Sequence, residues 1–205
     1  MDNIAKIYSS ILNKRIQKHL SDHDLLADEQ NGFRATRSCI DHIFSLITIL
    51  RNRKNAGKST FLCFVDYKLA FDSINRNLLF YKLSKFGIVG KMYKALSSLY
   101  QDPRSRVILN DIPTEYFQCL IGCKQGCCLS PTLFSIFADD LSKELNDSGV
   151  GIHVGNHDDD QNDDHDHDQS MIINHLLYAD DLVCLAETEE DLQKLINIIH
   201  TWCKK

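Results

Sequence analysis

Apolar side chains recur every three or four residues in six stretches of the chain. This spacing places them on one side of a helix, so each stretch is predicted to form an amphipathic helix. The stretches are 4–20, 40–50, 76–86, 92–100, 130–141 and 189–202. Ser38 is a predicted N-cap, and Gly87 is suited to follow a helix. Thr188 forms a capping pattern with Asp191 at the start of the last helix.

Other apolar runs are shorter and predict strands. Residues 60–65 form a continuous apolar run of strand length, which predicts a strand that is buried on both faces and ends at Asp66. Further strands are expected at 104–109, 115–121, 150–154 and 171–177. Residues 178–181 separate two apolar runs as a hairpin turn would. The mixed order predicts an α+β fold with helices on one face of a largely antiparallel sheet.

Three carboxylates stand at the ends of these predicted strands. Asp66 follows the buried strand, and Asp180 and Asp181 occupy the tip of the predicted hairpin. Ionised carboxylates at the edge of an apolar sheet are costly unless something compensates their charge. Carboxylates from adjacent strands can hold a pair of metal ions for nucleotidyl transfer, and oxygen ligands favour Mg²⁺ over zinc. The alternative is that these aspartates are ordinary turn residues.

The composition of the chain indicates the class of protein to which it belongs. The chain is 43% apolar and 25% charged, as globular proteins are. It has no apolar run that could span a bilayer and no signal-peptide pattern, so we expect neither a membrane nor a secreted protein. Residues 157–168 hold seven of the 28 acidic side chains, which leaves 21 against 23 basic ones and permits nucleic-acid binding. The eight cysteines are typical of reduced, mostly buried thiols.

Two segments imitate functional motifs. Residues 137–140 read Phe-Ala-Asp-Asp, but they lie within a predicted helix, and we interpret the two aspartates as helix surface. The Asp- and His-rich run 157–168 lacks the spacing of a calcium-binding loop. Its unpaired acids favour a solvated loop instead.

Four ordered blocks resemble the reverse transcriptases of non-LTR (LINE-type) retrotransposons. Residues 64–72 (FVDYKLAFD) resemble motif A of that family, 122–131 (GCKQGCCLSP) resemble motif B, and 178–181 (YADD) match motif C. Residues 30–38 (QNGFRATRS) resemble the fingers block, and 189–205 are similar to the palm helix after motif C. A lone YADD box would be a weak signal, whereas the ordered set is specific.

The resemblance implies a role for individual residues. The implied catalytic and metal-binding residues are Asp66, Asp180 and Asp181, which would hold two Mg²⁺ ions, with Mn²⁺ as a possible substitute. Among them, the resemblance makes Asp66 and Asp180 the metal ligands and Asp181 an additional acid of the same box. The implied nucleotide-binding residues are Phe71, Gln125 and Gly126, and the implied template-binding residues are Arg34 and Arg37. The Phe71 ring would collide with a 2′-hydroxyl and so favour deoxynucleotides. Taken singly, these residues could equally be core, turn or solvated loop residues.

The resemblance also implies an activity, an RNA-directed DNA polymerase that adds dNTPs to a primer 3′-hydroxyl on an RNA template. Its partners would be the RNA template, a DNA primer and dNTPs, without a membrane, and it would be intracellular, with the nucleus implied by the family. Residues 1–59 would form partial fingers and 60–205 the palm, with 155–170 a disordered acidic insert and the thumb absent. We therefore expect the 205-residue chain alone to polymerise poorly or not at all.

Some positions depart from the family pattern. Leu69 stands where Lys is usual, Thr36 where Gly is usual, and Cys128 where Pro is usual. None of these changes removes an implied metal ligand. Two alternatives stay open: an inactive retrotransposon remnant that folds and binds nucleic acid without turnover, and a related maturase or palm polymerase.

Overall fold

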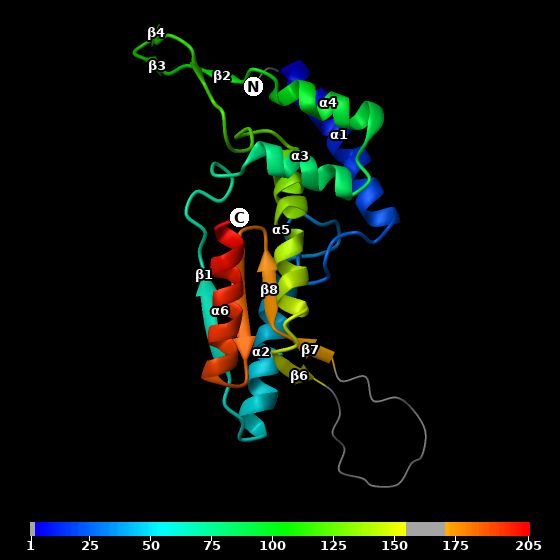
Figure 1. Ribbon diagram of the computed structural model, residues 1–205, viewed down its shortest axis with the longest axis vertical. Helices are drawn as coiled ribbons and strands as arrows, with labels where there is room; N and C mark the ends of the chain where they lie inside the picture. The colour runs from blue at the N-terminus through cyan, green and yellow to red at the C-terminus, as the bar shows by residue number, and fades with distance from the viewer. Residues whose placement is uncertain (1–2, 155–170) are drawn as a thin grey trace. The chain divides into compact units, whose positions relative to one another are not determined.

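The computed structural model describes residues 3–154 and 171–205, and Figure 1 shows their helices and strands. The helices are α1 (Asn3–Asp22), α2 (Cys39–Asn55), α3 (Arg76–Lys85), α4 (Gly90–Tyr100), α5 (Ser130–Asn146) and α6 (Glu189–Cys203). The strands are β1 (Phe61–Val65), β2 (Arg104–Ser105), β3 (Ile108–Leu109), β4 (Ile112–Pro113), β5 (Phe117–Gln118), β6 (Ile152–Val154), β7 (Met171–Ile173), β8 (His175–Tyr178) and β9 (Asp181–Ala186). All six predicted helices are present. The predicted insert 155–170 lies outside the described residues.

The chain divides into two compact units, each with its own apolar core. Unit 1 comprises residues 1–26 and 68–138, and unit 2 comprises residues 27–67 and 139–205. The division of the chain into fingers and palm at residue 59 stays a prediction.

Unit 1 is mainly helical. Its core joins α1, α3, α4 and the first half of α5. Only the second half of the predicted α1 stripe is buried: Leu12, Ile16 and Leu20 enter the core, whereas Ile4 and Ile7 are exposed. The apolar spacing therefore predicted the helix correctly but overestimated the part of it that is covered.

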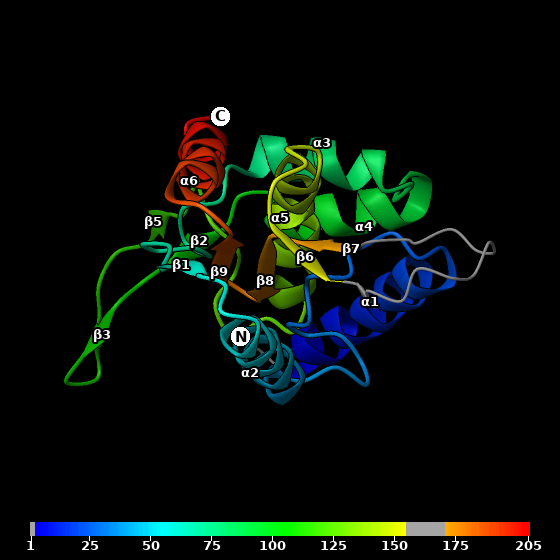
Figure 2. The ribbon, with the colours of Figure 1, turned by 90° about the horizontal axis from the view of Figure 1, so that it is seen from below.

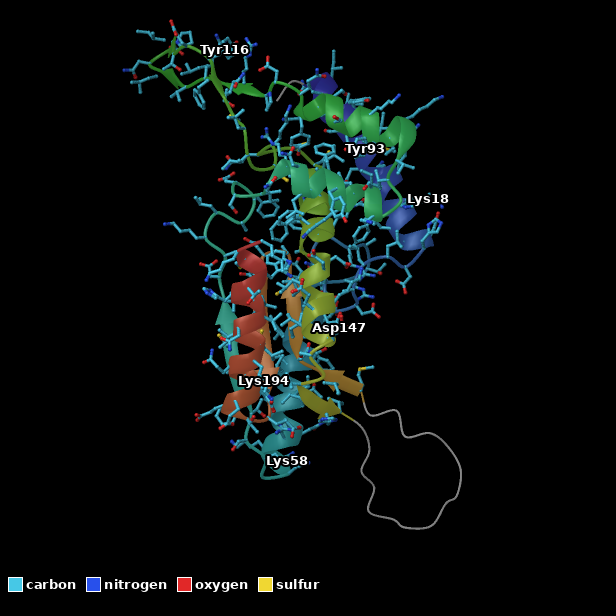
Figure 3. All side chains as sticks on the ribbon, in the orientation of Figure 1. Lys18, Lys58, Tyr93, Tyr116, Asp147 and Lys194 are labelled. Carbon is cyan, nitrogen blue, oxygen red and sulfur yellow. The ribbon has the colours of Figure 1, made fainter. Side chains whose placement is uncertain are left out.

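The two strands predicted at 104–109 and 115–121 lie in unit 1 and form a hairpin. Its pairing is interrupted, with β2 paired to β5 and β3 to β4. Asn110 and Asp111 form its tip with positive φ angles of 49° and 63°, as a tight hairpin turn requires. Tyr116, labelled in Figure 3, is 60% exposed on this hairpin.

Unit 2 is built on a three-stranded antiparallel sheet in the order β1-β9-β8. Successive residues of β9 point to opposite faces of the sheet, and those after Asp181 are all apolar. Both faces of the sheet must therefore be covered. Leu182, Cys184 and Ala186 share a core with α6 and the second half of α5. Val183 and Leu185 share a smaller core with α2. Figure 2 shows α6 and α2 on opposite sides of this sheet. The predicted α+β class is confirmed, and α2 adds a helix on the second face.

Two burial predictions for unit 2 are wrong. Strand β1 lies at the edge of the sheet, and Phe64 is 72% exposed on it, so β1 is not buried on both faces. Helix α2 leaves Ile40 and Phe44 of its predicted apolar stripe exposed. It faces the sheet with a neighbouring stripe that includes His42, Leu46 and Ile49.

The inward stripe of α2 ends in a buried arginine. The Arg53 guanidinium donates hydrogen bonds to the Ser59 carbonyl (2.6 Å) and to the Thr60 hydroxyl (2.8 Å). It also forms an ion pair with Glu187 at 2.7 Å. Because its donors find partners, this polar side chain can replace an apolar one in the core. The apolar pattern alone therefore points to the wrong side of the helix.

The predicted helix ends are confirmed. Ser38 accepts a hydrogen bond from Asp41 N, and Asp41 accepts one in return, which completes a capping box. Thr188 accepts from Asp191 N at the start of α6. Gly87 follows α3 with a φ of 76°, a conformation that glycine adopts without strain.

The prediction that the two aspartates of the Phe-Ala-Asp-Asp segment of α5 are helix surface is wrong. Asp139 is 3% exposed, accepts a hydrogen bond from Ala27 N at 2.7 Å and forms an ion pair with Lys143 at 2.6 Å. Asp140 accepts a hydrogen bond from the Trp202 indole at 2.9 Å. Both aspartates therefore have structural partners within unit 2.

All eight cysteines are free thiols, as predicted, but most of them are not buried. Only Cys123, Cys127 and Cys184 are buried. Burial raises the pKa of Cys123 to about 11 and that of Cys184 to about 12, which keeps these thiols protonated and unreactive. Among residues 3–154 and 171–205, no helix combines the length and hydrophobicity that a membrane span needs.

Candidate active site

The YADD box forms the turn between β8 and β9 in unit 2. Tyr178 pairs with Asp181 across the hairpin, which leaves Ala179 and Asp180 as a two-residue turn. Ala179 has a φ of 59°, the left-handed conformation that tight hairpins need and that a residue with a Cβ adopts at a cost. The predicted hairpin is therefore confirmed, with Asp180 in its turn and Asp181 as the first residue of β9.

The first aspartate reaches this hairpin through β1. Val65 pairs with Leu182, so the register, continued by one residue, places Asp66 opposite Asp181. Both carboxylates are exposed and line one cavity of about 340 Å³. Asp180 is half-buried in the turn and does not line that cavity. The structure thus brings Asp66 and Asp181 together and places Asp180 next to Asp181 in the chain.

The rest of this cavity is mostly apolar. Its wall comes from α2 and from the face of the sheet that α2 covers, with Phe64 and Tyr178 beside the carboxylates. The aromatic side chains offer flat surfaces, and the carboxylates give one end of the cavity a negative charge. This combination suits a ligand that joins an apolar ring to a cationic or metal-bound group.

The donor set fits a hard divalent cation. Mg²⁺ in proteins is commonly bound by one or two carboxylates and completed by water and substrate phosphates, and Asp66 and Asp181 can supply that number. In the part of the chain that the structure describes, no group of three or more His, Cys, Asp or Glu side chains could hold a metal ion. An assembly in which all three predicted aspartates bind metal stays a prediction.

The residues predicted to bind the nucleotide belong to unit 1. The Phe71 ring packs against Phe134, with the ring centres 4.7 Å apart, and its carbonyl accepts a hydrogen bond from Cys123 N at 2.8 Å. The Gln125 amide donates to both carboxylate oxygens of Asp72, each at 2.9 Å. The end of motif A and the start of motif B are therefore joined directly.

The contact between motifs A and B requires a glycine at position 122. A Cβ on Gly122 would lie 2.6 Å from the Asp72 carbonyl oxygen, and its φ is 80°. Gly126 also has a positive φ, of 72°, but the space around it is open. Gly122 therefore serves close backbone contact, and Gly126 serves the turn.

The two predicted template-binding arginines form hydrogen bonds within their own loop in unit 2. Arg34 donates to the Ala27 carbonyl at 2.8 Å. Arg37 donates to the Asp28 carbonyl at 2.7 Å and to its carboxylate at 2.6 Å. Arg37 is the more exposed side chain, at 32% against 19% for Arg34. Their contact with a template stays a prediction.

Comparison with known proteins then identifies the family. Residues 2–205 match the family model described as reverse transcriptase (RNA-dependent DNA polymerase). The chain belongs to the reverse transcriptase family. Reverse transcriptases generally use divalent metal ions, in keeping with the carboxylates at the hairpin.

Two curated relatives of this reverse transcriptase chain come from mobile elements. One is a retrovirus-related Pol polyprotein from the type-2 retrotransposable element R2DM of Drosophila melanogaster, 29% identical over 82% of this chain and 14% of the relative. The other is an RNA-directed DNA polymerase from the mobile element jockey of Drosophila funebris, 23% identical over 86% of this chain and 18% of the relative. The chain thus spans less than a fifth of the length of either relative.

A solved structure supports the fold. An apo telomerase from Candida tropicalis, truncated from its C-terminal domain, is similar with a TM-score of 0.63 at 14% identity. The similarity covers 93% of this chain and 36% of the telomerase chain. At this level of identity, the comparison supports the reverse transcriptase fold alone.

Sequence reasoning missed residues that hold the YADD turn of this reverse transcriptase chain. Gln30, Gly32 and His42 all contact the β8–β9 hairpin or its first strand. Gln30 and Gly32 were assigned only to a fingers block. A buried glutamine in a polar loop does not contribute to a periodic apolar pattern. The local sequence also does not indicate that Gln30 contacts Ala179.

The same loop contains a strained threonine. Thr36, which stands where the family usually has glycine, is exposed and has a φ of 66°. A β-branched residue in this conformation is strained by roughly 1–2 kcal/mol. We predict that Thr36→Gly stabilises the chain by about 1 kcal/mol, after allowing for the greater freedom of glycine in the unfolded state. Urea unfolding measures the difference. Thr36→Ala keeps a Cβ and should gain less, and equal stability of Thr36→Gly and the unchanged chain would contradict the strain.

Proposed function

We propose that this chain carries the catalytic centre of an RNA-directed DNA polymerase of a non-LTR retrotransposon. The reaction would add a dNTP to the 3′-hydroxyl of a DNA primer, directed by an RNA template. The observation that carries the proposal is the placement of Asp66 opposite Asp181, at one end of a shared cavity, in a chain of this family.

Asp66 and Asp181, with Asp180 from the adjoining turn, would hold two Mg²⁺ ions, and Mn²⁺ could replace them. Such ions, when bound, lower the pKa of the attacking hydroxyl and neutralise charge on the departing pyrophosphate. The contribution of the protein is to place carboxylates from two adjacent strands on one side of a sheet. The exposure of these carboxylates leaves room for substrate phosphates beside them.

The remaining roles belong to residues that face the substrates. Phe71, Gln125 and Gly126 would bind the nucleotide, and the direct contacts between motifs A and B support a common role for them. Arg34 and Arg37 would contact the RNA template. Because Arg37 is the more exposed of the two and its ion pair is with the exposed Asp28, a phosphate could replace that carboxylate at low cost.

Primer extension by the full-length gene product tests the proposed reaction. A DNA primer annealed to an RNA template should be extended with dNTPs in Mg²⁺ and not after chelation of the metal. Extension without an RNA or DNA template would point to a different transferase. Complete absence of incorporation in both Mg²⁺ and Mn²⁺ would support the inactive remnant instead.

The sugar selectivity of Phe71 is testable in the same assay. Phe71→Val removes the ring that would collide with a 2′-hydroxyl, so incorporation of ribonucleotides relative to deoxynucleotides should rise by about tenfold or more. Phe134→Leu is the matched control, because it changes the ring that packs against Phe71 and leaves the Phe71 ring in place. An unchanged ratio in Phe71→Val would remove Phe71 from the nucleotide site.

A further inference from the structure

A buried glutamine side chain holds the backbone of the YADD turn. Gln30 is 2% exposed, and its Oε1 accepts hydrogen bonds from Ala179 N at 2.9 Å and from Gly32 N at 2.7 Å. Its Nε2 donates to the Ala179 carbonyl at 3.1 Å. One side-chain amide thus satisfies both backbone polar groups of Ala179, as a neighbouring strand would.

The residue that Gln30 holds is the strained one. Ala179 has a φ of 59°, a left-handed conformation that is strained for a residue with a Cβ. Without both hydrogen bonds, the turn could relax toward a less costly conformation. Because Asp180 and Asp181 follow directly, a change in the Ala179 backbone would redirect their side chains.

The backbone around Gln30 fixes the amide in place. Leu177 N donates to the Glu29 carbonyl, and Asn31 N donates to the Leu177 carbonyl, each at 2.9 Å. Residue 30 thereby forms a parallel bridge with Leu177 of β8. The segment 29–31 therefore extends the sheet beyond β8, and the Gln30 side chain starts from a fixed position.

Gly32 brings this segment close to the turn. A Cβ on Gly32 would lie 2.1 Å from Ala179 N and 2.8 Å from Ala179 Cα, closer than any side chain allows. Glycine is therefore required here for the approach of two backbones.

His42 of α2 completes the support. Its Nε2 lies 2.9 Å from the Glu29 carbonyl oxygen and 3.1 Å from that of Leu177, and its Nδ1 lies 3.2 Å from the Asn31 amide nitrogen. These partners are satisfied when Nε2 carries the proton and Nδ1 accepts. The imidazole thus links α2, the segment 29–31 and β8.

We infer that Gln30 is a positioning residue for the carboxylates of Asp180 and Asp181. It acts through Ala179, by holding the turn in the conformation that presents both carboxylates to a bound cation. The inference rests on the proposed function, and it links the block assigned to the fingers with the aspartates of motif C.

The test measures cation binding by the 205-residue chain. Tb³⁺ is a suitable probe because it takes hard oxygen ligands and luminesces when a nearby tyrosine is excited. Tyr178 lines the same cavity as Asp66 and Asp181, whereas the acidic run 157–168 contains no tyrosine or tryptophan. Luminescence that is lost in Asp66→Asn therefore reports the hairpin site.

Two variants separate positioning from general stability. Gln30→Met keeps the size of the side chain and loses all three hydrogen bonds, so Tb³⁺ affinity should fall by about tenfold or more. The matched control is Asn174→Leu, which removes another buried amide, bonded to the Leu145 carbonyl, at the opposite end of β8. It should lower the free energy of unfolding without lowering Tb³⁺ affinity.

Gln30→Glu supplies a rescue that a purely structural role would not show. The ionised carboxylate accepts from Ala179 N but cannot donate to the Ala179 carbonyl, whereas the protonated acid can do both. The affinity of Gln30→Glu relative to the unchanged chain at the same pH should therefore recover as the pH falls from about 8 to about 6, because burial raises the pKa of a carboxyl group.

The outcomes are distinct. Unchanged Tb³⁺ affinity in Gln30→Met would overturn the inference, and so would an equal loss in Asn174→Leu. If Gln30→Met does not fold, the pH dependence of Gln30→Glu decides, and its absence would overturn the inference. If the unchanged chain shows no luminescence that depends on Asp66, the metal site and the proposed function fail, and this failure is visible without any Gln30 variant.

Discussion

Replacing Asp66 by asparagine is expected to lower dNTP incorporation by the full-length gene product about a thousandfold or more. The substitution keeps the size of the side chain and removes the negative charge that would hold a divalent cation beside Asp181. A metal ion contributes several kcal/mol of transition-state stabilisation, and each 1.4 kcal/mol is about a tenfold change in rate. The measurement is single-turnover primer extension on an RNA template.

The control for Asp66→Asn is Asp147→Asn. Asp147 is an exposed aspartate of the same unit, beyond the end of α5 and labelled in Figure 3. Its replacement should leave incorporation unchanged. Template binding should survive in both variants, because Asp66 would hold the metal and not the RNA. Equal incorporation by Asp66→Asn and the unchanged protein would end the catalytic assignment.

The second large effect is on stability at acid pH and comes from His175. This imidazole is fully buried at the start of β8. It lies 2.6 Å from the Asn174 side-chain oxygen and 2.9 Å from the Ser142 hydroxyl. Burial disfavours the charged form and lowers its pKa to about 4.

The direction of the pH effect follows from this pKa. The unfolded chain binds a proton at His175 near pH 6.5, but the folded chain does so only near pH 4. The unfolded state therefore holds more protons between these values, so stability is complete above about pH 6.5 and falls as the pH drops toward 4. With about 1.4 kcal/mol for each unit of pKa, the loss amounts to about 3 kcal/mol.

Urea unfolding at several pH values between 4 and 7 measures this loss. His175→Gln lacks a titratable group, and its free energy of unfolding should vary much less over that range. His200→Gln is the control, because His200 is exposed on α6 and its replacement should leave the pH dependence intact. If His175→Gln loses stability on acidification as steeply as the unchanged chain, His175 is not the source.

The parts of the fold that follow from neighbouring residues could be predicted from the sequence. Ser38 caps α2 as its position before the helix predicts, and Gly87 follows α3. The YADD turn lies between two strands, as its apolar flanks predict. In each case, the residues that determine the structure are only a few positions apart, so a local pattern contains the necessary information.

The parts that depend on distant partners could not be predicted. The inward side of α2 includes Arg53, which is buried because Glu187 and the segment after α2 pair with it. Asp139 is buried because Ala27 N and Lys143 pair with it. A polar residue leaves no periodic signal of burial, so the sequence pattern assigns it to the surface.

The candidate site shows the same limit. Adjacent strand ends place Asp66 near Asp181, as the order of elements suggested. The hydrogen bonds of Gln30 join residues 149 positions apart. The positive φ angles of Thr36 and Leu69 are likewise unexpected, because neither residue type favours that conformation.

The cavity beside the aspartates has an exposed thiol in its wall, that of Cys39 at the start of α2. Once the other accessible cysteines are changed to serine, an alkylating reagent could attach a spin label or a fluorophore at this single point. Such a label would report when a ligand enters the cavity, and a bulky adduct would itself compete for the space. The proposed active site is therefore open to covalent labelling and covalent inhibition through a side chain that takes no part in the proposed chemistry.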